Sequence, residues 1–103
     1  MTHNLGTLYI VATPIGNLQD ITYRAVEILK NTTFIAAEDT RKSKILLSHF
    51  NINKPLISYF EHNELKRIPQ ILKRINSGEN CALITDAGTP AISDPAYKLI
   101  RNA

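Results

Sequence analysis

Cysteine, glycine and long apolar stretches are all scarce in this sequence of 103 residues. Its single cysteine cannot form an intrachain disulfide, so the composition gives no sign of a secreted protein. Four glycines and five prolines are too few for a collagen-like or low-complexity chain, and a hydrophobic fraction of 44% is too high for a disordered one. What is left is an ordinary folded chain with a length that fits one domain.

No segment resembles a membrane span or an export signal. The longest uninterrupted apolar run covers residues 8–12, whereas a membrane helix needs roughly 20 apolar residues. Residues 1–4 also lack the basic stretch that leads into the apolar part of a signal peptide. We therefore expect a cytoplasmic protein with no membrane partner.

Positive charge is in slight excess. Twelve lysines and arginines against nine acidic residues give a formal charge of +3, and both halves of the chain contribute to the surplus. Such a balance is compatible with an anionic partner but does not establish one.

Four short apolar segments alternate with segments of helical apolar spacing. We predict strands at residues 8–12, 34–37, 56–60 and 81–85, of which the first is expected to be buried on both faces. The alternation predicts an α/β fold, with a mostly parallel sheet of about four strands, helices on both faces and right-handed crossovers. A further helix is predicted to begin at Asp94-Pro95, close to the end of the sequence. We therefore expect residues 1–103 to be the N-terminal α/β domain of a longer protein.

The first two helices are predicted at residues 22–31 and 40–50. Asp20 or Thr22 could cap the first helix, and Thr40 is expected to cap the second. Ile45 and Leu46 are expected to face the core from the second helix.

The third helix contains a proline, Pro69, which removes a backbone hydrogen bond beyond the first helical turn. This helix is expected either to start near Ile68 or to bend, and to end before Gly78. Its predicted inward face consists of Leu65, Ile68, Ile71, Leu72 and Ile75. Cys81, at the start of the next strand, is expected to be a small core residue.

Each predicted strand is followed by a polar segment, namely residues 13–20, 38–43, 61–64 and 85–94. In open α/β sheets such segments share one edge, where ligands bind beside helix N-termini. The segment after the first strand has the single glycine Gly16, which argues against a G-x-G-x-x-G dinucleotide site, and no P-loop motif is present. In the last segment, Asp86 could accept hydrogen bonds from hydroxyl or ammonium groups, and Gly88 would admit a ligand close to the backbone. A tight turn capped by Asp86 is the alternative.

Several charged residues in these segments have both a functional and a structural interpretation. Asp39 could act in metal binding or acid–base chemistry, converging with Asp20 and Asp86 on Mg²⁺, or simply begin a helix. His62 could be a general base or an exposed or capping histidine. The basic residues near this edge suit phosphate contacts but could equally form solvated helix faces; they are Arg41, Lys42, Lys44, Lys66 and Arg67.

Longer stretches carry a more specific signal. Residues 7–22, 37–41, 62–64 and 86–95 together resemble the tetrapyrrole (corrin/porphyrin) methylase superfamily, and within it the members that methylate ribosomal RNA. The resemblance covers essentially the whole chain. It implies methyl transfer from S-adenosyl-L-methionine to the ribose 2′-hydroxyl of a cytidine in 16S rRNA of the small ribosomal subunit. Members of the superfamily have two domains with the cofactor between them and are commonly homodimers, so this chain alone is expected to be inactive.

The resemblance also implies roles for individual residues. We expect no bound metal. The cofactor pocket would include Asp86, Gly88, Thr89, Pro90 and Ser93. The active-site loop would include Pro14, Gly16 and Asn17. Residues facing the RNA would be Glu38, Arg41, Lys42 and Asn63, and the candidates for the catalytic base are Asp39 and His62. Ala96 stands where the family typically has glycine, which changes little because alanine favours a helix.

Two other functions stay open. The chain could belong to a superfamily member that methylates a small molecule such as a tetrapyrrole precursor. The basic residues argue against this, and so does the loop at residues 14–20, where the tetrapyrrole enzymes carry a glycine-rich sequence. It could also be a non-catalytic module that binds nucleotides or RNA.

Overall fold

The computed structural model describes residues 5–13, 20–60 and 62–86. In this part of the chain four parallel strands form one sheet in the order β1-β4-β2-β3. The strands are β1 (Leu8–Thr13), β2 (Phe34–Ala37), β3 (Leu56–Ser58) and β4 (Cys81–Asp86). The helices are α1 (Tyr23–Asn31), α2 (Thr40–His49) and α3 (Glu64–Asn76). The predicted α/β fold with a parallel sheet is confirmed, and β3 ends two residues earlier than expected.

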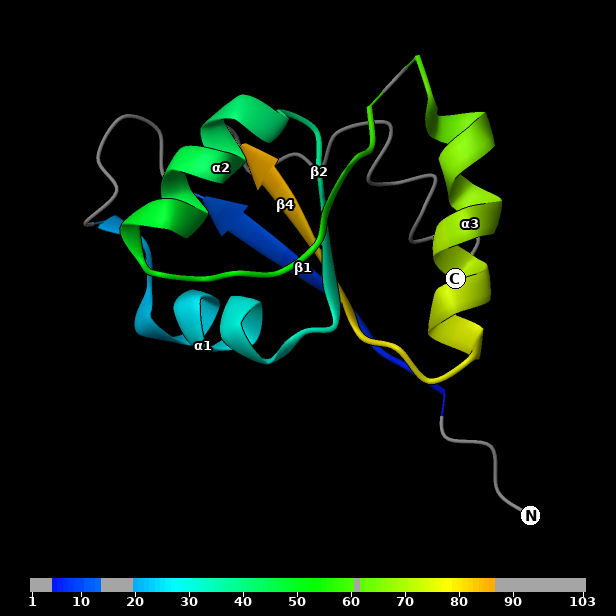
Figure 1. Ribbon diagram of the computed structural model, residues 1–103, viewed down its shortest axis with the longest axis horizontal. Helices are drawn as coiled ribbons and strands as arrows, with labels where there is room; N and C mark the ends of the chain where they lie inside the picture. The colour runs from blue at the N-terminus through cyan, green and yellow to red at the C-terminus, as the bar shows by residue number, and fades with distance from the viewer. Residues whose placement is uncertain (1–4, 14–19, 61, 87–103) are drawn as a thin grey trace.

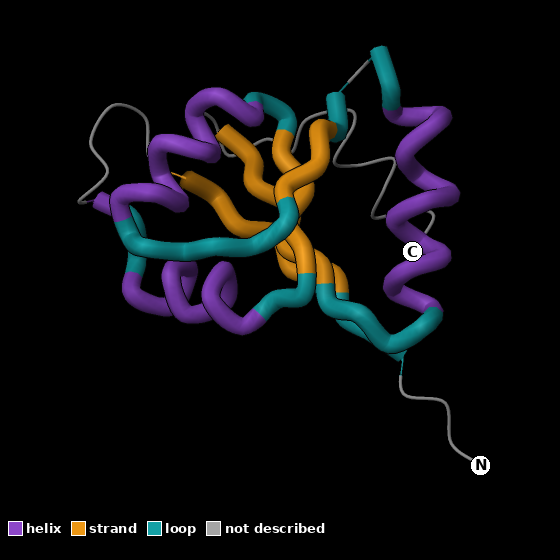
Figure 2. Tube along the Cα trace, viewed as in Figure 1, coloured by secondary structure: helices purple, strands orange, loops and turns teal. Residues whose placement is uncertain are grey.

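The sheet lies between two layers of helices, as Figure 1 shows: α1 and α2 cover one face and α3 covers the other. Figure 2 gives the same separation by secondary structure. Leu29 of α1 and Leu46 of α2 pack with Ile35 and Ile84 on the first face. Ile71 of α3 packs with Phe34 on the second. No helix among the described residues is long and apolar enough to span a membrane.

The central strands β2 and β4 are buried on both faces, whereas β1 is not. Val11 is buried under α1, but Ile10 is 38% exposed and Ala12 is exposed on the other face. The prediction that the first strand is buried on both faces is therefore wrong. The reason is that β1 lies at the edge of the sheet. The apolar cluster that α3 forms with the sheet includes Leu8 of β1, but it does not include Ile10 or Ala12 on the same face.

Helix starts are set by local side chains. Thr22 caps α1, because its Oγ1 accepts a hydrogen bond of 3.1 Å from the Ala25 N–H. Asp39 caps α2, so the expectation that Thr40 would do so is wrong, and Thr40 is the first helical residue. The Asp39 carboxylate accepts hydrogen bonds from two backbone N–H groups of the first turn, which makes Asp39 an effective cap.

Two predicted core residues on the helices are exposed. Ile45 is 63% exposed, and α2 instead buries Ser43, Leu46 and Leu47, which lie at the spacing of one helical face. Leu65 is 82% exposed on α3. There the inward positions run through Ile75, Ile71 and Ile68 back to a buried acid, Glu64.

α3 begins at Glu64, so it does not start near Ile68, and Pro69 lies inside it. Beyond its end, Gly78 has a φ of 101°, a left-handed conformation that glycine adopts without strain. Gly78 therefore ends the helix as predicted.

Cys81 follows at the start of β4 and is fully buried, which confirms it as a core residue. Burial raises the pKa of its thiol to about 12.

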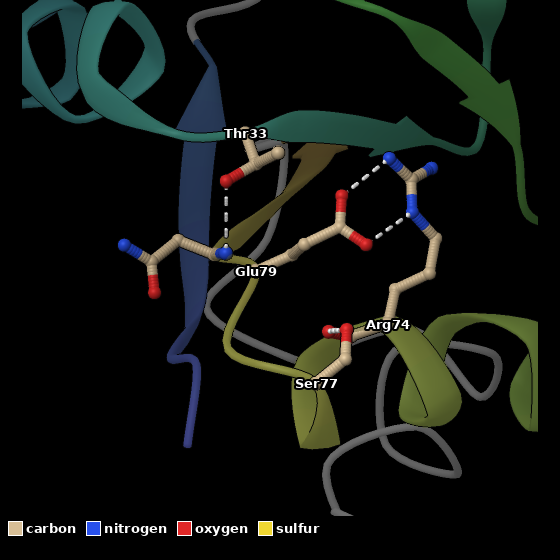
Figure 3. A network of polar contacts seen from close by, with 5 residues as sticks. Thr33, Arg74, Ser77 and Glu79 are labelled. Carbon is tan, nitrogen blue, oxygen red and sulfur yellow. Dashed lines mark hydrogen bonds and ion pairs between the residues drawn. The ribbon is translucent and has the colours of Figure 1, made fainter. Parts of the chain in front are cut away.

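Polar contacts hold together the edge of the sheet where β2 and β4 begin (Figure 3). The Asn80 N–H donates to Thr33 Oγ1 at 3.2 Å, and the Gly6 N–H donates to the Ile75 carbonyl at 2.7 Å. A Cβ atom on Gly6 would overlap the carbonyl oxygen of Glu79, so only glycine fits at this position without a shift of the backbone. The connections between α3, β4 and β2 are therefore tightly packed at this edge.

Candidate functional site

The carboxyl ends of all four strands meet at one edge of the sheet. Thr13 pairs with Asp86, and Ala37 pairs with both Ile84 and Ser58. Because every pair is parallel, the segments that follow the strands start along the same edge, as predicted. This edge is the candidate site.

β2 and β3 are neighbours whose onward connections leave in opposite directions. The chain passes from β2 into α2 on one face and from β3 into α3 on the other. In open α/β sheets, ligands bind where adjacent connections diverge in this way. Asp39 belongs to one connection and His62 to the other, so the two predicted candidates for the base flank the point of divergence.

Asp39 is half-buried and engaged with the helix that it caps. Its Oδ1 accepts hydrogen bonds from the N–H groups of Arg41 (3.0 Å) and Lys42 (3.2 Å). These contacts establish the structural role, and a role as base stays a prediction. The side chains of Arg41 and Lys42 are exposed in the first turn, where they can contact an anion.

Asn63 shapes the turn between β3 and α3. Its Oδ1 accepts from the Phe60 N–H at 2.8 Å, while its Nδ2 donates to the carbonyl (3.3 Å) and hydroxyl (3.0 Å) oxygens of Ser58. Arg67 Nε also donates to the Ser58 carbonyl, at 3.1 Å. The contacts of Asn63 support a positioning role in this turn, and its predicted contact with RNA stays a prediction.

His62 lies on the surface at this turn. Its ring meets that of Phe60 edge to face, with 5.8 Å between centroids and 72° between planes. Phe60 is partly exposed as well. The pair presents two rings at the surface of this edge, and a role of His62 as base stays a prediction.

Tyr59, which was predicted only as part of a strand, is a buried residue that directly follows β3 at this edge. It is fully buried, and its N–H donates to the Ala37 carbonyl at 2.9 Å. Burial first, and then the negative charges of Glu64 and Glu38, raise the pKa of its phenol to about 12. Tyr59 therefore keeps its proton at neutral pH. The signal that could have identified it is a tyrosine placed directly before a polar segment with two acids.

Glu64 is only 6% exposed, although it lies in the first turn of α3. A buried acid at this place was not predicted, because acids at helix starts are normally exposed and favourable to the helix dipole. Together with Glu38, it makes the environment of Tyr59 acidic. The charges at this edge are thus divided between acids close to Tyr59 and bases on the surface.

The remaining predicted residues lie at the end of β4 or outside the described part of the chain. Asp86 ends β4 beside Thr13, but its side chain lies outside the described part. The predicted cofactor residues Gly88, Thr89, Pro90 and Ser93 and the loop residues Pro14, Gly16 and Asn17 also lie outside the described residues. Within residues 5–13, 20–60 and 62–86, no three acidic, histidine or cysteine side chains gather in a group that could hold a metal ion.

An open groove lies away from this edge, where α2 ends and β3 begins. We refer to it as the α2 groove. It is lined by Lys44, Leu47, Ser48, Asn51, Ile52, Asn53, Lys54 and Leu56.

Comparisons with known proteins give a consistent result. The family model for tetrapyrrole (corrin/porphyrin) methylases matches residues 7–103. The chain is 56% identical over 99 residues to ribosomal RNA small subunit methyltransferase I of Mycoplasmopsis pulmonis. The aligned segment covers 96% of this chain and 45% of the relative. The proteins of the same name from Haemophilus influenzae and Escherichia coli O157:H7 are 54% and 53% identical over 98% and 93% of this chain. The chain spans 36% and 34% of those two relatives.

Proposed function

Because the chain belongs to the tetrapyrrole (corrin/porphyrin) methylase family, we propose that it contributes the N-terminal domain of a methyltransferase that uses S-adenosyl-L-methionine to modify RNA of the small ribosomal subunit. The observation that carries this proposal is 56% identity, across nearly the whole chain, to a protein named for that activity. The chain spans less than half of that relative, so the reaction is proposed for the longer protein.

The specific reaction that we propose is methylation of the ribose 2′-hydroxyl of a cytidine in 16S rRNA. When bound, S-adenosyl-L-methionine supplies an activated methyl group on sulfur. Transfer of this group to the hydroxyl oxygen would convert the donor to S-adenosylhomocysteine, and a base such as Asp39 or His62 would accept the hydroxyl proton. Holding the hydroxyl in line with the methyl group supplies much of the acceleration.

The described edge offers groups that suit binding of these molecules. Asp86 ends a central strand of the sheet, where a carboxylate would accept hydrogen bonds from the hydroxyl or ammonium groups of the cofactor. Arg41 and Lys42 project from the neighbouring connection as cations for RNA phosphates. Asp39 and His62, on the two sides of the point of divergence, are the proposed proton acceptors.

A chimera tests the proposal directly. The 103 residues of this chain would replace the aligned segment of the Haemophilus influenzae relative, to which they are 54% identical. We expect the chimera to methylate small ribosomal subunits that lack the modification, and nucleoside analysis of the product to show 2′-O-methylcytidine. A folded chimera that transfers no methyl group, or that methylates a base, would contradict the proposal.

The 103-residue chain alone is proposed to bind S-adenosyl-L-methionine weakly and to methylate no RNA, because it spans 34–45% of the curated relatives. Calorimetric titration and a methyl-transfer assay of the chain, with the chimera as positive control, measure both properties. Turnover by the chain alone comparable to that of the chimera would overturn this. A cytoplasmic location and a homodimer of the longer protein are proposed with the function.

A further inference from the structure

Basic residues are concentrated in two stretches of the chain that contain no acid, residues 40–60 and residues 65–78. Residues 40–60 contain four of the twelve lysines and arginines and none of the nine acidic residues. The net charge of this stretch exceeds the +3 of the whole chain. Residues 65–78 hold four more basic residues, all on α3, and no acid, but two of these, Arg67 and Arg74, bond to Ser58 and to Glu79.

The fold arranges this charge as a track along α2. Arg41, Lys44 and Ser48 follow the helical spacing i, i+3 and i+7, so they share one flank of the helix. Their neighbours Leu46 and Leu47 are buried against the sheet, which turns this flank toward solvent. A helix of ten residues is about 15 Å long, so the track leads from the candidate site to the opposite edge of the sheet.

The track ends in the α2 groove. Asn51 adopts a left-handed conformation with φ 57°, and the Ile52 N–H donates to the Leu47 carbonyl at 2.8 Å. This turn reverses the chain and brings Lys54 back to line the same hollow as Lys44. Leu47 and Ile52 give the hollow an apolar base, because both are buried.

The lining of the groove matches a sugar-phosphate backbone. The two lysines supply cations for phosphate, and the hydroxyl of Ser48 and the amides of Asn51 and Asn53 supply neutral hydrogen-bonding groups. No acid lines the groove to repel an anion. Phosphate and ribose contacts of this kind position a nucleic acid without reading its sequence.

We propose that the flank of α2 formed by Arg41 and Lys44, together with the α2 groove, binds the backbone of the substrate RNA beyond the nucleotide that is methylated. This inference rests on the proposed function. It adds a second contact region that orients the RNA along α2, so that the target nucleotide meets the edge where α2 begins.

Fluorescence anisotropy of the 103-residue chain with a labelled single-stranded fragment of 16S rRNA tests this interface without any methyl donor. The variant K44Q/K54Q removes both lysines of the groove, and K30Q/K73Q removes two exposed lysines from α1 and α3. For K44Q/K54Q we expect roughly five- to tenfold weaker binding and a salt slope smaller by about 1.4, since each single-strand phosphate contact contributes about 0.7. For K30Q/K73Q the change should stay below about twofold, because only long-range attraction is lost.

The proposal would be overturned if both variants lost the same RNA affinity, or if K44Q/K54Q kept the salt slope of the wild type. The groove would then be a candidate site for another partner, such as an acidic protein. Far-UV circular dichroism checks that both variants fold. The single variant K44Q, which alters one exposed helical side chain, should reduce the slope by half as much. An inactive chimera would count against the proposed function alone, because binding is measured separately. In an active chimera, K44Q/K54Q should raise KM for RNA and leave kcat unchanged.

Discussion

Arg74 of α3 and Glu79 of the following turn form an ion pair through two hydrogen bonds, with Nε 3.1 Å from Oε2 and Nη2 2.8 Å from Oε1 (Figure 3). The guanidinium also lies over the ring of Phe34, 3.8 Å from its centroid. One side chain thus connects the last turn of α3, the approach to β4 and the start of β2. This arrangement needs a flat, forked cation, which arginine provides and lysine does not.

Replacing Arg74 by lysine should destabilise the fold although the charge is retained. The lost stacking on Phe34 is expected to lower the free energy of unfolding by about 0.5–1 kcal/mol. Urea unfolding followed by circular dichroism measures this change. The matched control is Lys73→Arg at the adjacent exposed position, which should leave the midpoint unchanged. Equal midpoints for wild type and Arg74→Lys would show that the geometry of the pair contributes nothing.

Acid should weaken the same contact. The hydrogen bond from Arg74 lowers the pKa of Glu79 in the folded state. The stabilisation is therefore present above the unfolded pKa of the carboxyl group and is lost as the pH falls through the folded one. Thermal unfolding across the acid range should show wild type above Glu79→Gln at neutral pH, with the difference closing below the ordinary glutamate range. A constant difference would exclude Glu79 as its source.

Gly6→Ala should destabilise the sheet edge where the strands begin. The new methyl group would overlap the Glu79 carbonyl, and the neighbouring backbone would have to shift. Overpacking of this kind costs about 1–3 kcal/mol, which chemical unfolding can measure. Leu5→Ala changes a neighbouring exposed side chain and should stay within about 0.5 kcal/mol. An unchanged midpoint for Gly6→Ala would mean that this crossing is loose.

Two substitutions of Asp39 separate its capping role from a role as base. Asp39→Ala should lose about 1 kcal/mol of stability because the cap is removed, whereas asparagine caps equally well. In the chimera, Asp39→Asn should keep the fold but lower kcat if the carboxylate accepts the proton. Full activity of Asp39→Asn would leave Asp39 as a helix cap only, and the same assay on His62→Gln would then test the other candidate.

Cys81 should report on the opening of the core. It is the only cysteine, it is fully buried, and burial raises its pKa to about 12. Because the thiolate is the reactive form, iodoacetamide should modify the native chain very slowly and the urea-unfolded chain readily. Mass spectrometry of timed samples follows the reaction. Fast alkylation under native conditions would show that the start of β4 opens frequently.

Local patterns predicted the elements well but not their places in the sheet. Alternation of apolar segments predicted the strands, and Gly78 and Cys81 behave as expected. A short apolar segment has the same sequence pattern in a central strand and in an edge strand, because long-range pairing sets the order of the strands. The exposure of Ile10 therefore could not be predicted. The inward position of Glu64 was missed for a similar reason, because long-range packing of α3 decides whether Glu64 or its neighbour Leu65 faces the sheet.

The candidate site was predicted at the level of the edge and less well at the level of roles. Parallel strands necessarily place Asp39 and Asn63 at one edge. The sequence could not tell that their polar groups are engaged with the backbone of their own turns, because such bonds depend on the conformation of each turn. Tyr59 and its acidic surroundings come from three separate elements, and no local pattern brings these together.

The strand order has a consequence for synthesis. β1 and β2 are not bonded to each other; each pairs with β4, which comes last among the described strands. While the chain emerges from the ribosome, N-terminus first, β1 lacks β4, its neighbour among the described strands, until residues 81–86 have appeared. Cooperative closure of the sheet therefore waits for that final insertion. Nascent chains stopped before it should be susceptible to protease, and those that extend past it should be protected.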